Sequence, residues 1–272
     1  MPDSWFRFER NEAGPSDVFL YGEIGNFGIT ASQFVKELNE YDDVRIRINS
    51  PGGSVDDGMA IYEALREHPH AVETKTDAAA YSIASVIAQA ADPGKRTMAP
   101  RSRMLIHEAS TFGGGRAVDF EQTAARLRET TKLIAGVYAE KSGKDADHFL
   151  ALMADEKRYT ADEAVAENLA DRVTTNTDKR AFALAAGFDL SNFRNCADMQ
   201  KELEEAAAEL GVEPLEVPDG LEEVINKAIL AAIPGIREAV EALLKETNKQ
   251  PYQAPSDAAR RELEERLAKV QL

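Results

Sequence analysis

The feature that most constrains the fold of this chain is residues 78–90, which read AAAYSIASVIAQA. The stretch is almost entirely small or apolar, yet it carries two hydroxyl groups, those of Ser82 and Ser85. It is long for a strand and rich in alanine, which favours helices. We therefore predict a buried helix over these residues, with the rest of the domain arranged around it.

Strand and helix patterns alternate along the chain on both sides of this stretch. Strand patterns cover residues 17–21, 44–48, 72–76, 103–106 and 170–174, and residues 44–48 alternate strictly between apolar and charged side chains. Helix patterns cover residues 30–38, 55–67, 118–141, 145–154 and 160–168. Such alternation is typical of an α/β domain with a mainly parallel sheet, which we place in residues 1–192.

The C-terminal region, residues 193–272, has a different character. From Ala197 to Leu272 there are 17 acidic and 9 basic residues, so this region carries half of the net charge of −16. Its helix patterns are amphipathic but suggest no enclosed core. We therefore expect an acidic, helical, scaffold-like extension, and the alternative is a flexible tail that only aids solubility.

Charge and composition exclude several classes of function. An acidic chain lacks the basic face that nucleic-acid binding needs, and no apolar run reaches the ~20 residues of a membrane span. The N-terminal residues lack the apolar segment of a secretory signal, and the single cysteine, Cys196, fits a reducing compartment. We thus expect a cytoplasmic protein that binds neither nucleic acid nor membranes.

Metal and cofactor chemistry have little support in the sequence. No cluster of His, Cys and Asp has the spacing of metal ligands. The run Gly113–Gly115 precedes a helix pattern but lacks the Lys-Ser/Thr of a phosphate-binding loop. We therefore predict neither a metal nor a cofactor.

Ser82 is the candidate nucleophile. A serine hydroxyl needs a base within hydrogen-bond reach and N–H donors for the oxyanion that forms. The N–H of Ile83 would be free at the start of the helix, and Gly53 has no Cβ to keep substrate from its N–H. The alternative is that Ser82 is a small packing residue, whereas Ser85 is expected to make an internal hydrogen bond.

His107 is the candidate base, because it alone among the four histidines ends an apolar strand. The alternative is a histidine with a structural role. A catalytic triad also needs a carboxylate that fixes the tautomer of the imidazole. Asp155 and Glu156 are the candidates, and the residues themselves leave the choice open.

Taken together, six stretches resemble the proteolytic subunit of the Clp protease, ClpP, and still more the ClpP-related head-maturation (prohead) proteases of tailed phages. They follow the family's order and spacing over about residues 15–175: Tyr21–Ile24, Ile48–Val55, Gly58–Tyr62, Ala80–Ile87, Met104–His107 and Tyr159–Val165. The resemblance implies a catalytic Ser82, His107 and Glu156, with Asp155 as the alternative acid. It also implies an oxyanion hole made by the N–H groups of Gly53 and Ile83.

The resemblance further implies a ClpP/crotonase-type superhelix of βαβ units with a C-terminal helical extension, assembled into a homo-oligomeric ring. The helix 118–141 matches the family's handle between rings. The Gly113–Gly115 loop matches the segment that receives an extended polypeptide substrate at a sheet edge. Tyr81 stands where the family usually has a small residue, which predicts a narrower pocket or an altered turn at Ser82.

Three functions are consistent with these features. The first is a serine endopeptidase that processes phage capsid and scaffold proteins through an acyl-enzyme. The second is an acyl-thioester enzyme of the crotonase type, which shares the fold but normally uses carboxylates. The third is an assembly scaffold with a weakly active or inactive ClpP-like domain, which the acidic extension suggests.

Overall fold

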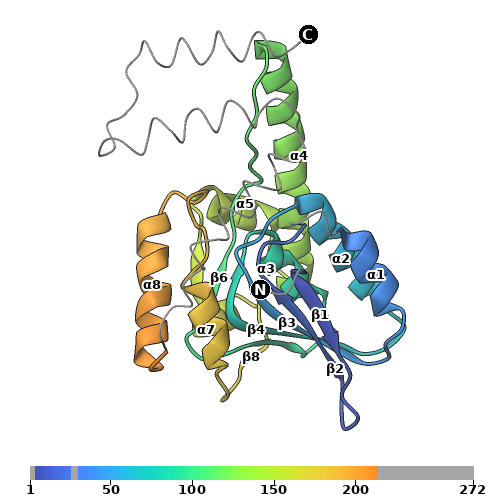
Figure 1. Cartoon of the computed structure of the whole chain (residues 1–272). Helices are drawn as coiled ribbons and strands as arrows, with labels where there is room; N and C mark the ends of the chain where they lie inside the picture. Colours follow the sequence, from blue (N-terminus) through green and yellow to red (C-terminus); the bar gives the residue numbers. More distant parts are fainter. Residues whose placement is uncertain (1–3, 26–29, 213–272) are drawn as a thin grey trace, which may run out of the picture. The chain divides into compact units, whose positions relative to one another are not determined.

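The computed structural model describes residues 4–25 and 30–212 (Figure 1). Its strands form one eight-stranded sheet: β1 (Phe6–Glu9), β2 (Ser16–Tyr21), β3 (Val44–Ser50), β4 (Val72–Tyr81), β5 (Arg96–Met98), β6 (Arg103–Leu105), β7 (Arg158–Thr160) and β8 (Arg172–Val173). Its α-helices are α1 (Ala31–Leu38), α2 (Val55–Arg66), α3 (Ile83–Ile87), α4 (Ala117–Ser142), α5 (Ala146–Ala154), α6 (Ala161–Ala166), α7 (Lys179–Ala185) and α8 (Cys196–Glu209). The predicted α/β class is confirmed.

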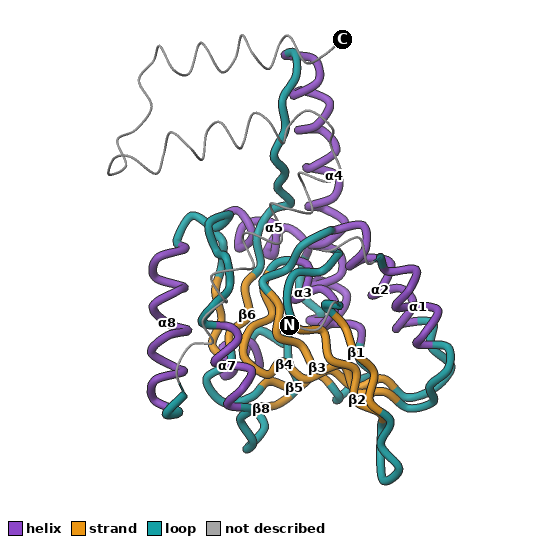
Figure 2. The backbone as a smooth tube through the Cα atoms, in the orientation of Figure 1, coloured by secondary structure: helices purple, strands orange, loops and turns teal. Residues whose placement is uncertain are grey.

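The centre of the sheet is parallel. Strands β2, β3 and β4 are parallel neighbours, and α1 and α2 connect them in sequence (Figure 2). At the edges, β1 pairs antiparallel with β2, and β7 pairs antiparallel with β6. The βαβ order places the carboxyl ends of β3 and β4 side by side, and a turn follows each of them.

The predicted helix over residues 78–90 is wrong in its first five positions. Residues 78–81 belong to β4, and α3 begins only at Ile83. The cause is a second partner strand: β4 pairs with β5 through Thr74–Thr76 and with β6 through Ala79–Tyr81. Pairing with β6 satisfies the buried backbone groups, and this outweighs the low strand propensity of alanine.

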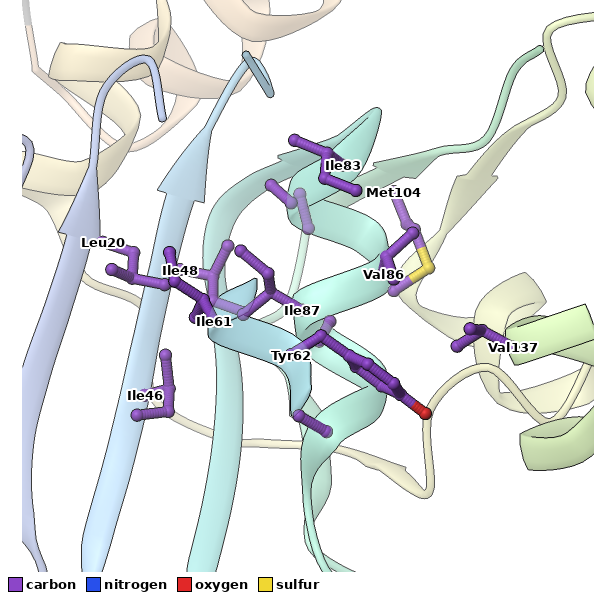
Figure 3. Close-up of a cluster of buried hydrophobic side chains, with 14 of the residues drawn as sticks. Leu20, Ile46, Ile48, Ile61, Tyr62, Ile83, Val86, Ile87, Met104 and Val137 are labelled. Atoms are coloured by element: carbon purple, nitrogen blue, oxygen red, sulfur yellow. The ribbon is translucent and has the colours of Figure 1, made fainter. Parts of the chain in front are cut away.

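One face of the sheet packs against α1, α2 and α3 in the main core. The apolar side chains of β3, predicted from its alternation, are fully buried here. Figure 3 shows Ile46 and Ile48 of β3 together with Ile61 of α2 and Ile87 of α3. This core holds α3, and with it the turn at Ser82, against the sheet.

The opposite face is covered by α7 and α8 (Figure 1). A second core cluster joins Tyr81 and Leu105 of the sheet to Phe182 of α7 and to Met199 and Leu203 of α8. The compact unit therefore includes α8, and the boundary that we expected near residue 192 lies inside it. The rest of the expected extension, residues 213–272, lies outside the described residues.

A buried charge cluster joins the sheet to α7. The carboxylate of Asp77 has no exposed side-chain surface and accepts hydrogen bonds from Arg47, at 2.5 and 2.8 Å, and from the hydroxyl of Tyr21 at 2.8 Å. The Lys75 ammonium lies 3.0 Å from the same carboxylate. Arg47 also binds Asp178, whose side chain caps α7, so the charged side of β3 anchors this helix.

The long helix α4 is packed only along its C-terminal half. Its buried residues lie between Thr131 and Ser142, whereas Val118, Phe120 and Leu133 are exposed. The helix ends at Gly143, which has the left-handed backbone that favours glycine there. Within the described residues, no helix has the length and apolarity needed to cross a membrane.

If α8 is part of the compact unit, truncating its buried face should destabilise the whole domain. We expect Leu203→Ala to lower the free energy of unfolding by about 3 kcal/mol, because a fully buried leucine leaves a cavity. Glu205→Ala, on the exposed side of the same helix, should change it by less than about 0.5 kcal/mol. Urea denaturation of both variants checks this, and equal stabilities would place α8 outside the domain.

Candidate active site

Ser82 lies in the turn between β4 and α3, where its backbone is held in an unusual conformation. Its φ and ψ are 54° and −130°, a region that residues with a side chain rarely adopt. Its N–H donates to the carbonyl of Leu105 at 3.0 Å. The strand pair β4–β6 thus fixes the turn, and the Ser82 side chain is left half-buried at the start of α3.

The glycine turn after β3 fits against Ser82. A Cβ on Gly52 would lie 2.6 Å from the Cβ of Ser82, and Gly52 also has a positive φ of 105°. Gly53 has a φ of 138°, and a Cβ there would lie 2.2 Å from the carbonyl oxygen of Ile24. Both positions therefore require glycine.

Two backbone N–H groups beside Ser82 remain available as donors. Ile24 bridges to the glycine turn by donating to the Gly52 carbonyl at 2.8 Å and accepting from Ser54 at 2.9 Å. Gly53 itself is exposed, and its N–H has no backbone acceptor in the described part of the chain. Ile83 is the first residue of α3, so its N–H has no acceptor within the helix.

His107 lies two residues after the end of β6, and the register of the sheet brings it beside Ser82. Tyr81 pairs with Leu105, so the residues that follow these two strands lie next to each other. The Nε2 atom of His107 lies 2.7 Å from the Oγ atom of Ser82. Nε2 can accept the hydroxyl proton only when the neutral imidazole carries its own proton on Nδ1.

Burial lowers the pKa of His107 below its ordinary value, because desolvation disfavours the imidazolium. The negative charges of Glu156 and Glu108 act in the opposite direction, while the positive charge of Arg194 adds to the lowering. The imidazole is therefore neutral at neutral pH, the state in which Nε2 can accept a proton.

The carboxylate of Glu156 lies near the imidazole but is not hydrogen-bonded to it. Both of its oxygens accept from Arg194, at 2.9 Å from the backbone N–H and 3.0 Å from Nε. Within residues 4–25 and 30–212, no hydrogen bond is formed by Nδ1 of His107. The alternative acid, Asp155, is exposed at the end of α5, and of the two only Glu156 is close enough to act on the pKa of His107.

Two residues at this site, Phe193 and Arg194, were not found from the sequence. They lie in the connection between α7 and α8, and the ring of Phe193 contacts His107 edge-on with 5.2 Å between ring centroids. Phe193 also packs on Tyr81, 6.2 Å away. Tyr81 is 1% exposed within the second core, so it fills the space beneath Phe193. No local pattern marks either residue, because the contacts depend on how α8 packs.

Ser85 points into the domain, as predicted. Its hydroxyl donates to the carbonyl of Ser82 at 2.5 Å and lies 2.7 Å from the hydroxyl of Tyr138 on α4. Because the single hydrogen of Ser85 is used toward Ser82, the hydroxyl of Tyr138 is the donor in the second contact. Through these two hydrogen bonds, Ser85 links the backbone of Ser82 to α4.

A groove of about 720 Å³ begins at Gly53. One wall is the start of α2, and the other is formed by residues 109–114 and the exposed half of α4. Gly113 and Gly114 lie in this wall, where we expected a segment that receives an extended chain. Among the described residues, no group of three or more His, Cys, Asp and Glu is placed to hold a metal ion.

Comparison with known proteins agrees with this geometry. The model of the Clp protease family matches residues 16–177. An ATP-dependent Clp protease proteolytic subunit 1 of Corynebacterium glutamicum is 37% identical over 132 residues, which are 48% of this chain and 64% of that protein. An ATP-dependent Clp protease proteolytic subunit of Ligilactobacillus salivarius is 32% identical over 166 residues, which are 60% of this chain and 84% of that protein.

The contact between Gly52 and Ser82 leads to a prediction about reactivity. We expect Gly52→Ala to slow the reaction of Ser82 with a fluorophosphonate probe by about 100-fold or more, because the new Cβ displaces the nucleophile. Gly136→Ala on α4 meets no atom within 4 Å and serves as the matched control. Equal labelling of the two variants would contradict the tight fit.

The environment of His107 leads to a prediction about pH. Because the pKa of the imidazole is lowered, the base stays deprotonated, and thus competent, to lower pH than an ordinary histidine. We expect the acidic limb of Ser82 labelling to have its midpoint below 6.5. A series of labelling rates from pH 4 to 8 measures this midpoint, and a value above 6.5 would contradict the predicted burial effect.

Proposed function

Because the chain belongs to the Clp protease family, we propose that it is a serine endopeptidase that cleaves polypeptides through an acyl-enzyme on Ser82. The observation that carries the proposal is the 2.7 Å contact between Oγ of Ser82 and Nε2 of His107. It joins a nucleophile and its base beside two unpaired N–H groups, which is the arrangement that acyl transfer needs.

The first half of the reaction forms the acyl-enzyme. Oγ of Ser82 attacks the carbonyl carbon of the scissile peptide bond while its proton passes to Nε2 of His107. The N–H groups of Gly53 and Ile83 stabilise the oxyanion, and each such donor contributes about 3 kcal/mol. The imidazolium then gives its proton to the leaving amine, the C–N bond breaks, and an ester on Ser82 remains.

The second half restores the enzyme. A water molecule loses a proton to Nε2 of His107 and attacks the ester carbonyl, and the same two N–H groups hold the oxyanion. The imidazolium returns the proton to Oγ of Ser82 as the ester bond breaks. We assign Glu156 as the carboxylate that supports the imidazole, because its charge acts on His107 and that of Asp155 does not.

The groove at Gly53 supports an extended polypeptide as the substrate. An extended chain laid along residues 109–114 would present backbone groups to that unpaired segment and reach the nucleophile past Gly53. Both relatives are named as proteolytic subunits, which supports a homo-oligomer. The exposed apolar residues of α4, Val118, Phe120 and Leu133, provide a surface for subunit contact.

We further propose that the natural substrates are capsid and scaffold proteins processed during phage head maturation. The support is the sequence resemblance and the acidic character of residues 197–272, of which those after residue 212 hold 12 acidic and 8 basic residues. Such an extension suits docking on basic surfaces of an assembling shell. A crotonase-type activity is less well supported, because the Ser82–His107 pair is organised for acyl transfer to serine.

The central test is the removal of the nucleophile. We expect Ser82→Ala to reduce peptide cleavage by about 10⁴-fold or more and to abolish labelling by a fluorophosphonate. Ser32→Ala is the matched control, because Ser32 is exposed on α1 and its loss should leave Ser82 reactive. Labelling that persists in Ser82→Ala would rule out the proposed nucleophile.

The natural substrate requires its own test. Purified precursor shells of a tailed phage, built from coat and scaffolding proteins, are incubated with the wild-type chain or with Ser82→Ala. We expect only the wild type to cut the scaffolding protein, as seen by mass spectrometry. If the wild type cleaves unfolded casein but leaves the shells intact, it is a protease without the proposed assembly role.

A further inference from the structure

The connection between α7 and α8 contacts the candidate catalytic groups although it lies outside the matched family domain. The family match ends at residue 177. Phe193 and Arg194 come after it, on the C-terminal side of α7. Phe193 is 6% exposed and packs on the imidazole of His107. Its neighbour Arg194 binds Glu156. A segment outside the matched family domain thus touches two of the three groups assigned to catalysis.

The contact between Arg194 and Glu156 uses both carboxylate oxygens. The backbone N–H and the Nε of Arg194 each donate to a different oxygen of Glu156, and its Nη2 donates to the carbonyl of Ala154 at 2.6 Å. The Glu156 side chain is 9% exposed and that of Arg194 is 64% exposed, so the carboxylate is shielded while water still reaches the guanidinium. The backbone of Glu156 has a positive φ of 50°, which is costly for a residue with a side chain.

Phe193 and Arg194 are held in place by the packing of α8. Met199 and Leu203 are buried on the sheet, and Glu202 and Glu209 form ion pairs with Arg158 and Arg101 at 3.2 and 2.8 Å. This anchorage fixes the N-terminal end of α8, two residues after Arg194. The position of Arg194 therefore follows from α8 as a whole.

We propose that Arg194 is a positioning residue that holds the carboxylate of Glu156 away from His107, so that the centre works as a Ser82–His107 pair until Glu156 is released. The proposal rests on the proposed function, since it assigns a control to that site. In a triad the carboxylate accepts the hydrogen bond from Nδ1 and stabilises the imidazolium. Here the carboxylate of Glu156 accepts hydrogen bonds from Arg194 instead. The positive charge of Arg194 also disfavours the protonated, positively charged form of His107.

The charged groups that act on His107 define what should change when Arg194 is removed. They are Glu156, which lies just after α5, Arg194, which lies just before α8, and Glu108, which follows His107 in the chain. Removal of Arg194 takes away the only positive charge in this set and leaves Glu156 without its ion pair. Both changes favour the imidazolium, so the pKa of His107 should rise.

The test uses the full-length chain with Arg194→Ala and two measurements. One is the rate of Ser82 labelling by a fluorophosphonate, and the other is the pKa of His107 from an NMR titration of its imidazole. We expect the labelling rate at neutral pH to rise by about tenfold, because the freed Glu156 orients the base. We expect the pKa of His107 to rise, with the acidic limb of labelling shifting to higher pH by the same amount.

Three further variants separate the proposal from a structural role. Arg194→Lys keeps the charge and should return the pKa of His107 toward the wild-type value. The double variant Arg194→Ala with Glu156→Gln should lose the gain, because no carboxylate remains to be released. Lys201→Ala breaks the exposed ion pair of Lys201 with Glu205 on α8 and should leave both measurements unchanged.

An unchanged or slower labelling rate in Arg194→Ala, with an unchanged pKa of His107, would overturn the proposal. A wild-type chain that is not labelled at Ser82 would overturn the proposed function instead. The two failures are distinguishable, because the imidazole titration reports on Arg194 without requiring activity.

Discussion

The structure depends on a backbone conformation that Ser82 adopts only because the residues around it impose it. The cost of such a positive φ is about 1–3 kcal/mol. It is met by the hydrogen bond from the Ser82 N–H to Leu105, by the packing of α3 in the main core, and by Gly52, which alone leaves room for the Ser82 side chain. The strained turn aims the hydroxyl at His107 instead of into the helix.

The length of β4 explains how the side chains of Ser82 and His107 meet. A ten-residue strand is long enough to pair with β5 through its first half and with β6 through its second half. The second pairing sets Tyr81 opposite Leu105, so Ser82, which follows Tyr81, lies close to His107, two residues after Leu105. A shift of one residue in this register would send His107 to the other face of the sheet.

The parts of the site that the sequence predicted are those with a local signal. The glycine turn, the serine at the start of a helix and the histidine at the end of a strand each depend on neighbours in the chain. The extension of β4 was missed because alanine gives a helix pattern, whereas the pairing with β6 decides the structure. The contacts of Phe193 and Arg194 were missed because they depend on α8 packing on the sheet, which no short pattern encodes.

The hydrogen bond between Ser85 and Tyr138 has a mechanical consequence. It joins the helix of the nucleophile to the buried half of α4, whose 26 residues span about 39 Å. The N-terminal half of α4 extends beyond the core, and Val118 and Phe120 in it are exposed. Tyr138 lies in the buried C-terminal half. Breaking this hydrogen bond would be costly, because both hydroxyl groups are buried and that of Tyr138 would lose its acceptor.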